Sequence, residues 1–124
     1  MNLNEILQYQ VAFEKLMTAI DKIFDRNPEY GLSRCASLQA AEKAVKEFIR
    51  SKGEKVERTH NLNNLIQVAK PLELPDIDET LIAQVQCTTG VRYSEEQSTI
   101  KQAYEAYCSA LDICNLVAEN IEKN

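Results

Sequence analysis

Residues 36–66 read ASLQAAEKAVKEFIRSKGEKVERTHNLNNLI, and this stretch decides the fold class. Ala36, Ala40 and Ala44 recur every fourth residue, which places them on one side of a helix. Beside them runs an apolar stripe of Leu38, Ala41, Val45, Phe48 and Ile49. Gly53 ends this helix, because glycine readily adopts the backbone conformation that closes a helix C-terminus. The stretch therefore predicts two helices joined by a basic hinge.

The ends of these two helices carry capping residues. Ser33 can cap the first of them, which we expect to be about 18 residues long and to end near Lys52-Gly53. Thr59 or Asn61 can cap the second, a short helix that Pro71 stops. Its apolar residues are Leu62, Leu65, Ile66 and Ala69.

Three further helices are predicted from spacing. The first covers about residues 2–25, where one face carries Ile6, Phe13, Met17, Ile20 and Phe24. Another opens at Pro75 and Asp76 and ends near residues 89–90. The last begins at a capping-box pattern formed by Ser94 and Gln97. Its stripe is Ile100, Tyr104, Tyr107, Leu111, Cys114, Ala118 and Ile121.

These helices predict an all-α fold. Short connections favour antiparallel neighbours, so we expect an up-down four-helix bundle in which the short third helix is an extra crossover. A chain of 124 residues suits one domain, residues 1–124. No apolar run approaches the roughly 18 residues of a membrane span, and the first residues lack the pattern of a signal peptide. We therefore expect a cytoplasmic protein that makes no membrane contact.

The four cysteines are Cys35, Cys87, Cys108 and Cys114, and no two of them form a C-x-x-C pair. With a single histidine in the chain, a four-ligand zinc site would need all four thiols to converge. We predict reduced thiols at core or boundary positions, with no metal and no cofactor.

Charge is unevenly distributed. Residues 43–60 carry six basic and three acidic side chains, a net charge of +3, whereas residues 61–124 carry four basic and ten acidic side chains, a net charge of −6. Lys43, Lys46 and Arg50 lie within about 60° of one another on the predicted helix and should form an exposed basic ridge. Such a ridge is more often a solvated face than a site, and its functional interpretation is a docking surface for a phosphate or an acidic partner.

His60 and Arg92 flank predicted helix starts. His60 can fix the turn at the third helix, or act as a base if a partner orients its ring. Arg92 can clamp a phosphate or a neighbouring subunit, or bond the last carbonyls of the preceding helix. Extended nucleic acid is an unfavourable ligand for a chain of pI about 4.9.

From about Tyr30 to Ile121 the chain resembles a HEPN domain, a small helical bundle found alone or beside minimal nucleotidyltransferases. The resemblance rests on the alanine-faced helix, the Thr59-His60-Asn61 helix start and Arg92-Tyr93 ahead of the final helix. The family pattern continues with proline after that pair, and Ser94 replaces it here. The resemblance implies assembly through the long helices as a homodimer or a hetero-oligomer, for which Tyr104 and Tyr107 are candidate anchors. The alternative is that both tyrosines fill the core of the bundle itself.

Ribonucleolytic members of this family carry Arg, four to six residues and then His in the last helix. No histidine follows Arg92, and nine residues separate Arg50 from His60. We therefore predict a non-catalytic protein that binds a nucleotide-like ligand or serves as the partner subunit of a minimal nucleotidyltransferase. The alternatives are a metal-independent endoribonuclease toxin and a structural helical homodimer. The predicted ligand-binding residues are Lys46, Arg50, His60 and Arg92.

Overall fold

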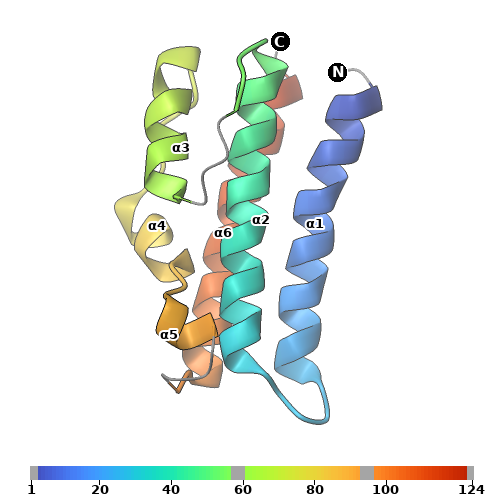
Figure 1. The fold of residues 1–124 in the computed structure, drawn as a ribbon, viewed down its shortest axis with the longest axis vertical. Helices are drawn as coiled ribbons and strands as arrows, with labels where there is room; N and C mark the ends of the chain where they lie inside the picture. Colours follow the sequence, from blue (N-terminus) through green and yellow to red (C-terminus); the bar gives the residue numbers. More distant parts are fainter. Residues whose placement is uncertain (1–2, 57–60, 93–96, 123–124) are drawn as a thin grey trace.

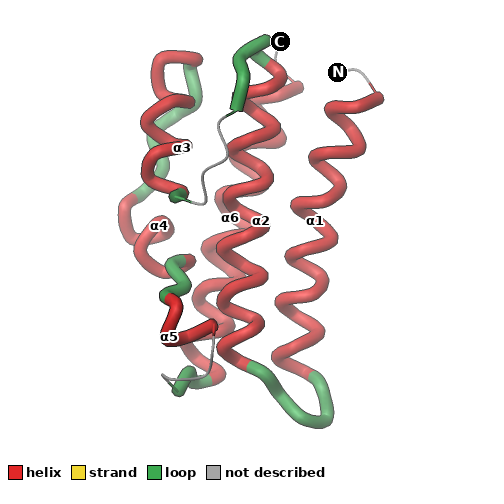
Figure 2. Tube along the Cα trace, in the orientation of Figure 1, coloured by secondary structure: helices red, strands yellow, loops and turns green. Residues whose placement is uncertain are grey.

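The computed structural model describes residues 3–56, 61–92 and 97–122 (Figure 1). Along the chain, the elements are α1 (Leu3–Phe24), α2 (Tyr30–Ser51), α3 (Leu62–Ala69), the 3₁₀ turn η1 (Lys70–Leu72), α4 (Glu79–Val85), α5 (Thr89–Arg92) and α6 (Ile100–Glu122). Within these ranges every regular element is helical, as Figure 2 shows. The predicted all-α class is confirmed.

Three long helices form the body of the molecule. The middle one, α2, packs against both α1 and α6, which also contact each other. The short elements α3, α4 and α5 follow one another along the remaining side of α2 (Figure 1). The described residues thus contain three long helices and a layer of short ones, where four longer helices were expected.

The sequence of α2 explains its central place. The predicted apolar stripe is buried throughout, and Val45 and Phe48 are fully buried. Ala40 and Ala44 are fully buried as well, and small side chains there let neighbouring helices approach closely. Burying one large apolar side chain such as Phe48 contributes about 1.5–3 kcal/mol. The predicted core of this helix is confirmed.

The ends of α2 differ in how well they were predicted. The C-terminal end agrees, because the helix stops at Ser51 and Gly53 has a φ of +81°. The predicted cap at Ser33 is wrong, since α2 begins at Tyr30 and Ser33 lies inside it. The Ser33 hydroxyl instead donates a hydrogen bond of 2.7 Å to the carbonyl oxygen of Ala19 on α1. A serine that lies next to another helix can donate its hydroxyl hydrogen bond to a carbonyl oxygen of that helix, and it then does not cap the helix to which it belongs.

The short helices show their own capping. Asn61 caps α3, since its side chain accepts a hydrogen bond from the Asn64 amide. The predicted start of the fourth helix at Pro75 is wrong, because α4 starts at Glu79 and Asp78 caps it. Gln86 is extended, and this break separates α4 from α5.

The capping box of the last helix lies five residues later than predicted. The Thr99 hydroxyl accepts a hydrogen bond from the Gln102 amide at 3.1 Å, and the Gln102 side chain accepts one from the Thr99 amide at 2.9 Å. This reciprocal pair defines the start of α6. Ser94, the predicted cap, lies outside the described residues.

The prediction that all four thiols are reduced is wrong for two of them. Cys35 and Cys87 form a disulfide, with their Cα atoms 5.2 Å apart, while Cys108 and Cys114 are free. The pair is separated by 52 positions in the sequence, so spacing along the chain carries no signal of it. The packing of the α4–α5 connection on α2 brings the two residues together.

Among the described residues, no helix combines the length and the apolarity needed to cross a membrane.

Candidate functional site

The basic residues of α2 lie on the side away from the apolar stripe, but they are not a uniformly exposed ridge. Lys46 is only 8% exposed, Lys43 is partly exposed and Arg50 is exposed. The predicted exposed ridge is therefore wrong at Lys46. The reason is the central position of α2, which has neighbouring elements around most of its circumference.

Buried carboxylates accompany these cations. Glu42 and Glu47 are 4% and 1% exposed, and Glu47 lies 3.8 Å from the Arg50 guanidinium. Burial lowers the pKa of Lys46, the charge of Lys43 lowers it further, Glu42 opposes this effect, and Arg50 adds a smaller lowering. The cluster can hold an anion, because Lys46 and Arg50 stand one turn apart and each carries hydrogen-bond donors.

The four predicted ligand-binding residues do not all come together. Lys46 and Arg50 are neighbours in the last turns of α2, whereas His60 lies outside the described residues. Arg92 ends α5, and α5 packs near Gly31 at the start of α2. Lys46 is about four turns, or ~22 Å, further along α2. The structure brings Lys46 and Arg50 together and places Arg92 near the other end of α2.

An apolar surface on α1 and α6 was recognised from the sequence only in part, through Tyr104 and Tyr107 as candidate anchors for assembly. Along α1, the stripe that includes Met17 and Phe24 is not the buried one, since these side chains are 64% and 72% exposed. The buried face of α1 consists of Ala12, Leu16, Ala19 and Ile23. On α6, Ile100 and Tyr104 are each 52% exposed, and the buried residues again include several alanines.

A hydrogen bond links α1 directly to α6. The Tyr9 hydroxyl on α1 donates a hydrogen bond to the carbonyl oxygen of Cys114 on α6. Tyr9 precedes Phe13 by one turn and packs edge-on against it, with ring centroids 5.0 Å apart. Cys114 lies on the flank of α6 that also carries Tyr107 and Leu111. We call the joint surface the α1–α6 face: Phe13, Met17, Ile20, Phe24, Ile100, Tyr104, Tyr107 and Leu111.

Exposed residues of the α1–α6 face gather toward one end of the molecule. The helices run antiparallel, so the second half of α1 and the first half of α6 lie at the same end of the bundle (Figure 1). Met17, Phe24, Ile100 and Tyr104 together expose on the order of 500 Å², which matches the largest apolar patch of a typical monomer. Two stripes of large apolar residues beside stripes of alanine are the sequence signal that could have identified this face.

A groove of about 970 Å³ lies between α3 and α4, and half of its lining residues carry amide or carboxylate side chains. Asn63, Gln67, Asp76 and Glu79 are among them and are all exposed, so water solvates them. Within the described ranges, no group of three or more cysteine, histidine or carboxylate side chains is arranged to hold a metal ion.

A family model, the HEPN domain, matches residues 9–121 and so covers nearly the whole chain. The chain belongs to the HEPN family. Comparison with curated proteins and with solved structures found no match. As a HEPN domain, the protein differs from the ribonucleolytic pattern in its last helix, since the only histidine in the sequence is His60.

Proposed function

We propose that the protein is a non-catalytic HEPN domain that acts as a binding subunit, and that a second copy of the chain covers its α1–α6 face. One observation carries this proposal: Met17 and Phe24, two large apolar side chains on α1, are more than 60% exposed at the same end of the bundle as the exposed Ile100 and Tyr104 of α6. Exposed apolar surface of this kind marks an interaction site.

The size and chemistry of the patch favour a second copy. An interface of standard size buries about 800 Å² on each partner, and the four exposed side chains alone supply more than half of that. A twofold interface must be complementary to itself, and an apolar patch satisfies this condition without charge pairing. The chain has a net charge of −5, so two copies that met through their acidic surfaces would repel each other. Contact through the apolar patch avoids most of this repulsion.

The absence of a catalytic role is inferred from the last helix. Cleavage of RNA without a metal needs groups that take up and release a proton, and histidine is the usual one. Helix α6 contains no histidine, and none occurs elsewhere after His60. RNA incubated with the pure protein should therefore survive, and His60→Ala should not change this result.

We infer further that residues 1–124 form one domain and that the protein resides in the cytoplasm. A minimal nucleotidyltransferase is the alternative occupant of the α1–α6 face, since HEPN domains are found beside such enzymes. It would replace the second copy if the chain alone remained a monomer.

Light scattering at micromolar concentration tests the assembly, with a monomer mass of 14.1 kDa as reference. We expect twice this mass for the natural chain and the monomer mass for Phe24→Glu and Met17→Glu. Val68→Glu is the matched control, because Val68 is 50% exposed on α3, away from this face. A monomer mass throughout would exclude self-association, and binding of a purified minimal nucleotidyltransferase, lost in Phe24→Glu, would then identify the other occupant.

A second function is proposed at Lys46 and Arg50, where the protein binds the phosphate of a nucleotide-like ligand. The supporting observation is that Lys43, Lys46 and Arg50 lie on one side of α2, with Lys46 and Arg50 one turn apart. The pKa of Lys46 is lowered first by burial and then by repulsion from Lys43, Glu42 opposes this lowering, and repulsion from Arg50 adds the smallest part. An anion would relieve this repulsion. His60 and Arg92 remain predicted contributors, although the position of Arg92 at the opposite end of α2 makes Lys46 and Arg50 the main candidates.

Calorimetric titration with nucleotides tests the ligand site. A charge-assisted contact contributes about 1.5–3 kcal/mol, so Arg50→Ala should weaken binding about tenfold or more. Added salt should weaken it as well. Lys101→Ala serves as the control, since Lys101 lies exposed on α6. Equal binding by Arg50→Ala and the natural chain would rule out a ligand site at Lys46 and Arg50. An RNA cleavage activity that is lost in His60→Ala would overturn the non-catalytic proposal.

A further inference from the structure

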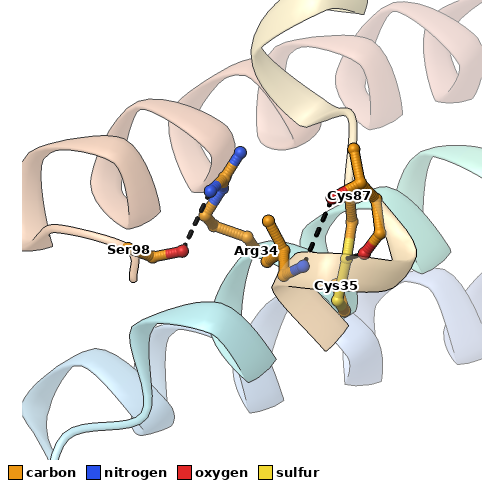
Figure 3. The surroundings of a disulfide bond; sticks show 6 residues. Arg34, Cys35, Cys87 and Ser98 are labelled. Atoms are coloured by element: carbon orange, nitrogen blue, oxygen red, sulfur yellow. Dashed lines mark hydrogen bonds between the residues drawn. A yellow bond between two sulfur atoms is a disulfide. The ribbon is translucent and has the colours of Figure 1, made fainter. Parts of the chain in front are cut away.

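Arg34 and Cys35, two consecutive residues of α2, each hold a residue of the connection between α4 and α6. Cys35 is disulfide-bonded to Cys87, just after α4, and Arg34 donates a hydrogen bond of 2.9 Å to the Ser98 hydroxyl, just before α6 (Figure 3). Helix α5 lies between these two attachment points. The first turns of α2 therefore act as the anchor for the connection between α4 and α6.

Helix α5 depends on such anchors. It has four residues, and a helix of that length is not stable without tertiary contacts. Val91 is 1% exposed and packs close to Gly31, where an added Cβ would lie 2.9 Å from the Val91 carbonyl oxygen. The Thr88 hydroxyl accepts a hydrogen bond from the Val91 amide, but this bond is internal to the segment. The disulfide is the only covalent anchor, since the other two cysteines are free.

The two sulfur atoms differ in surroundings. Cys35 is 4% exposed within α2, whereas Cys87 is partly exposed in a loop. A small thiol can therefore approach the pair from the side of Cys87. A hollow of about 400 Å³ lies next to α5. It is lined by residues at the start of α2, such as Gly31, and by residues between α4 and α6, such as Val91 and Ser98.

We propose that the Cys35–Cys87 disulfide is a redox latch that holds α5 on the start of α2 and releases it when the bond is reduced. A dithiol reductant supplies the electrons. One of its thiolates attacks the Cys87 sulfur and forms a mixed disulfide, while Cys35 leaves as a thiolate and takes up a proton. The second thiol of the reductant then displaces Cys87, so the products are two cysteine thiols and one oxidised dithiol.

Release should be local. The long helices α1, α2 and α6 are held by their own buried residues, so reduction leaves the body of the bundle folded. Helix α5 loses its covalent anchor, and the close packing of Val91 on Gly31, beside the hollow, opens to solvent. In a reducing compartment, disulfides are usually transient and serve redox sensing, which agrees with such a role. The latch is independent of the proposed dimer and ligand site.

Thiol counting tests whether the bond forms. The full chain is treated with oxidised or reduced dithiothreitol, unfolded in acid and alkylated, and its mass is measured. We expect two alkylated cysteines after oxidation and four after reduction. Four alkylated cysteines in both samples would overturn the proposal.

Hydrogen exchange tests whether the bond is a latch. On reduction, the amides of residues 87–92 should exchange at least about tenfold faster, while those in the middle of α1 and α2 keep their rates. In Cys87→Ser this segment should exchange fast with or without reductant, and in the control Cys108→Ser it should respond like the natural chain. Equal exchange of residues 87–92 in both redox states would show that the bond has no latch role. If Cys87→Ser did not fold, the oxidised and reduced natural chain would still decide the question.

Discussion

The Tyr9 hydroxyl on α1 bonds to the carbonyl oxygen of Cys114 on α6, across 105 positions of the sequence. This contact joins the first and last long helices directly, without α2 between them. It also sets which flank of α1 faces α6. Phe13, which packs on Tyr9, and Tyr107 on α6 are both partly buried against the core.

Tyr9→Phe should lower the free energy of unfolding by about 1 kcal/mol, because it removes one partly buried hydrogen bond and keeps the ring. Urea denaturation followed by circular dichroism measures the change. The control is Tyr104→Phe on the exposed part of α6, which should alter stability by less than about 0.5 kcal/mol. Equal effects of the two substitutions would contradict a structural role for the Tyr9 hydroxyl.

Thr99→Ala should destabilise the protein by about 1 kcal/mol, because it removes half of the capping box of α6. Thr18→Ala is the matched control. The Thr18 hydroxyl bonds to the Glu14 carbonyl inside α1, where such a bond adds little, so this variant should be as stable as the natural chain or slightly more. Thermal unfolding of both variants checks the difference, and an unchanged midpoint for Thr99→Ala would refute the cap.

Lys46→Met should leave the stability at neutral pH unchanged or raise it by about 1 kcal/mol, because a buried charge is replaced by an apolar chain of similar length. Since the pKa of Lys46 is lowered on folding, the natural chain should gain stability as the pH rises from its folded pKa toward 10.5, and Lys46→Met should lack this gain. Urea denaturation across this pH range measures both effects. A large loss of stability in Lys46→Met would instead assign the residue a structural charge pairing.

Alkaline pH should weaken the fold through Cys114. Burial raises the pKa of its thiol to about 12, compared with a reference value of 9.0, so the unfolded chain loses this proton first. The stabilising contribution of the neutral thiol is complete below pH 9 and is lost as the pH rises toward 12.

Cys114→Ala should therefore show a smaller fall in stability between pH 8 and pH 11, whatever its stability at pH 8. Cys108→Ala, at a partly exposed position of the same helix, should keep the fall of the natural chain. Urea denaturation at the two pH values provides the measurement. An identical fall in both variants would show that the Cys114 thiol does not contribute.

The sequence by itself determined the helical class, the core of α2 and several helix ends. These features depend on residues within one or two turns of one another, such as the alanines and the apolar stripe of α2, Gly53 after it and Asn61 before α3. The family could also be predicted from residues 36–66 and the residues before the last helix, and the family match confirms it.

Only the tertiary structure decided which of the predicted faces are inside. In α1, the stripe with Met17 and Phe24 is apolar enough for a core, but the alanine face packs against α2 because small side chains allow closer helix contact. The burial of Lys46 and the pairing of Cys35 with Cys87 have the same origin. The burial of a residue on α2, and its pairing, depend on which element packs against α2 at that residue. Contacts between residues far apart in the chain determine this packing.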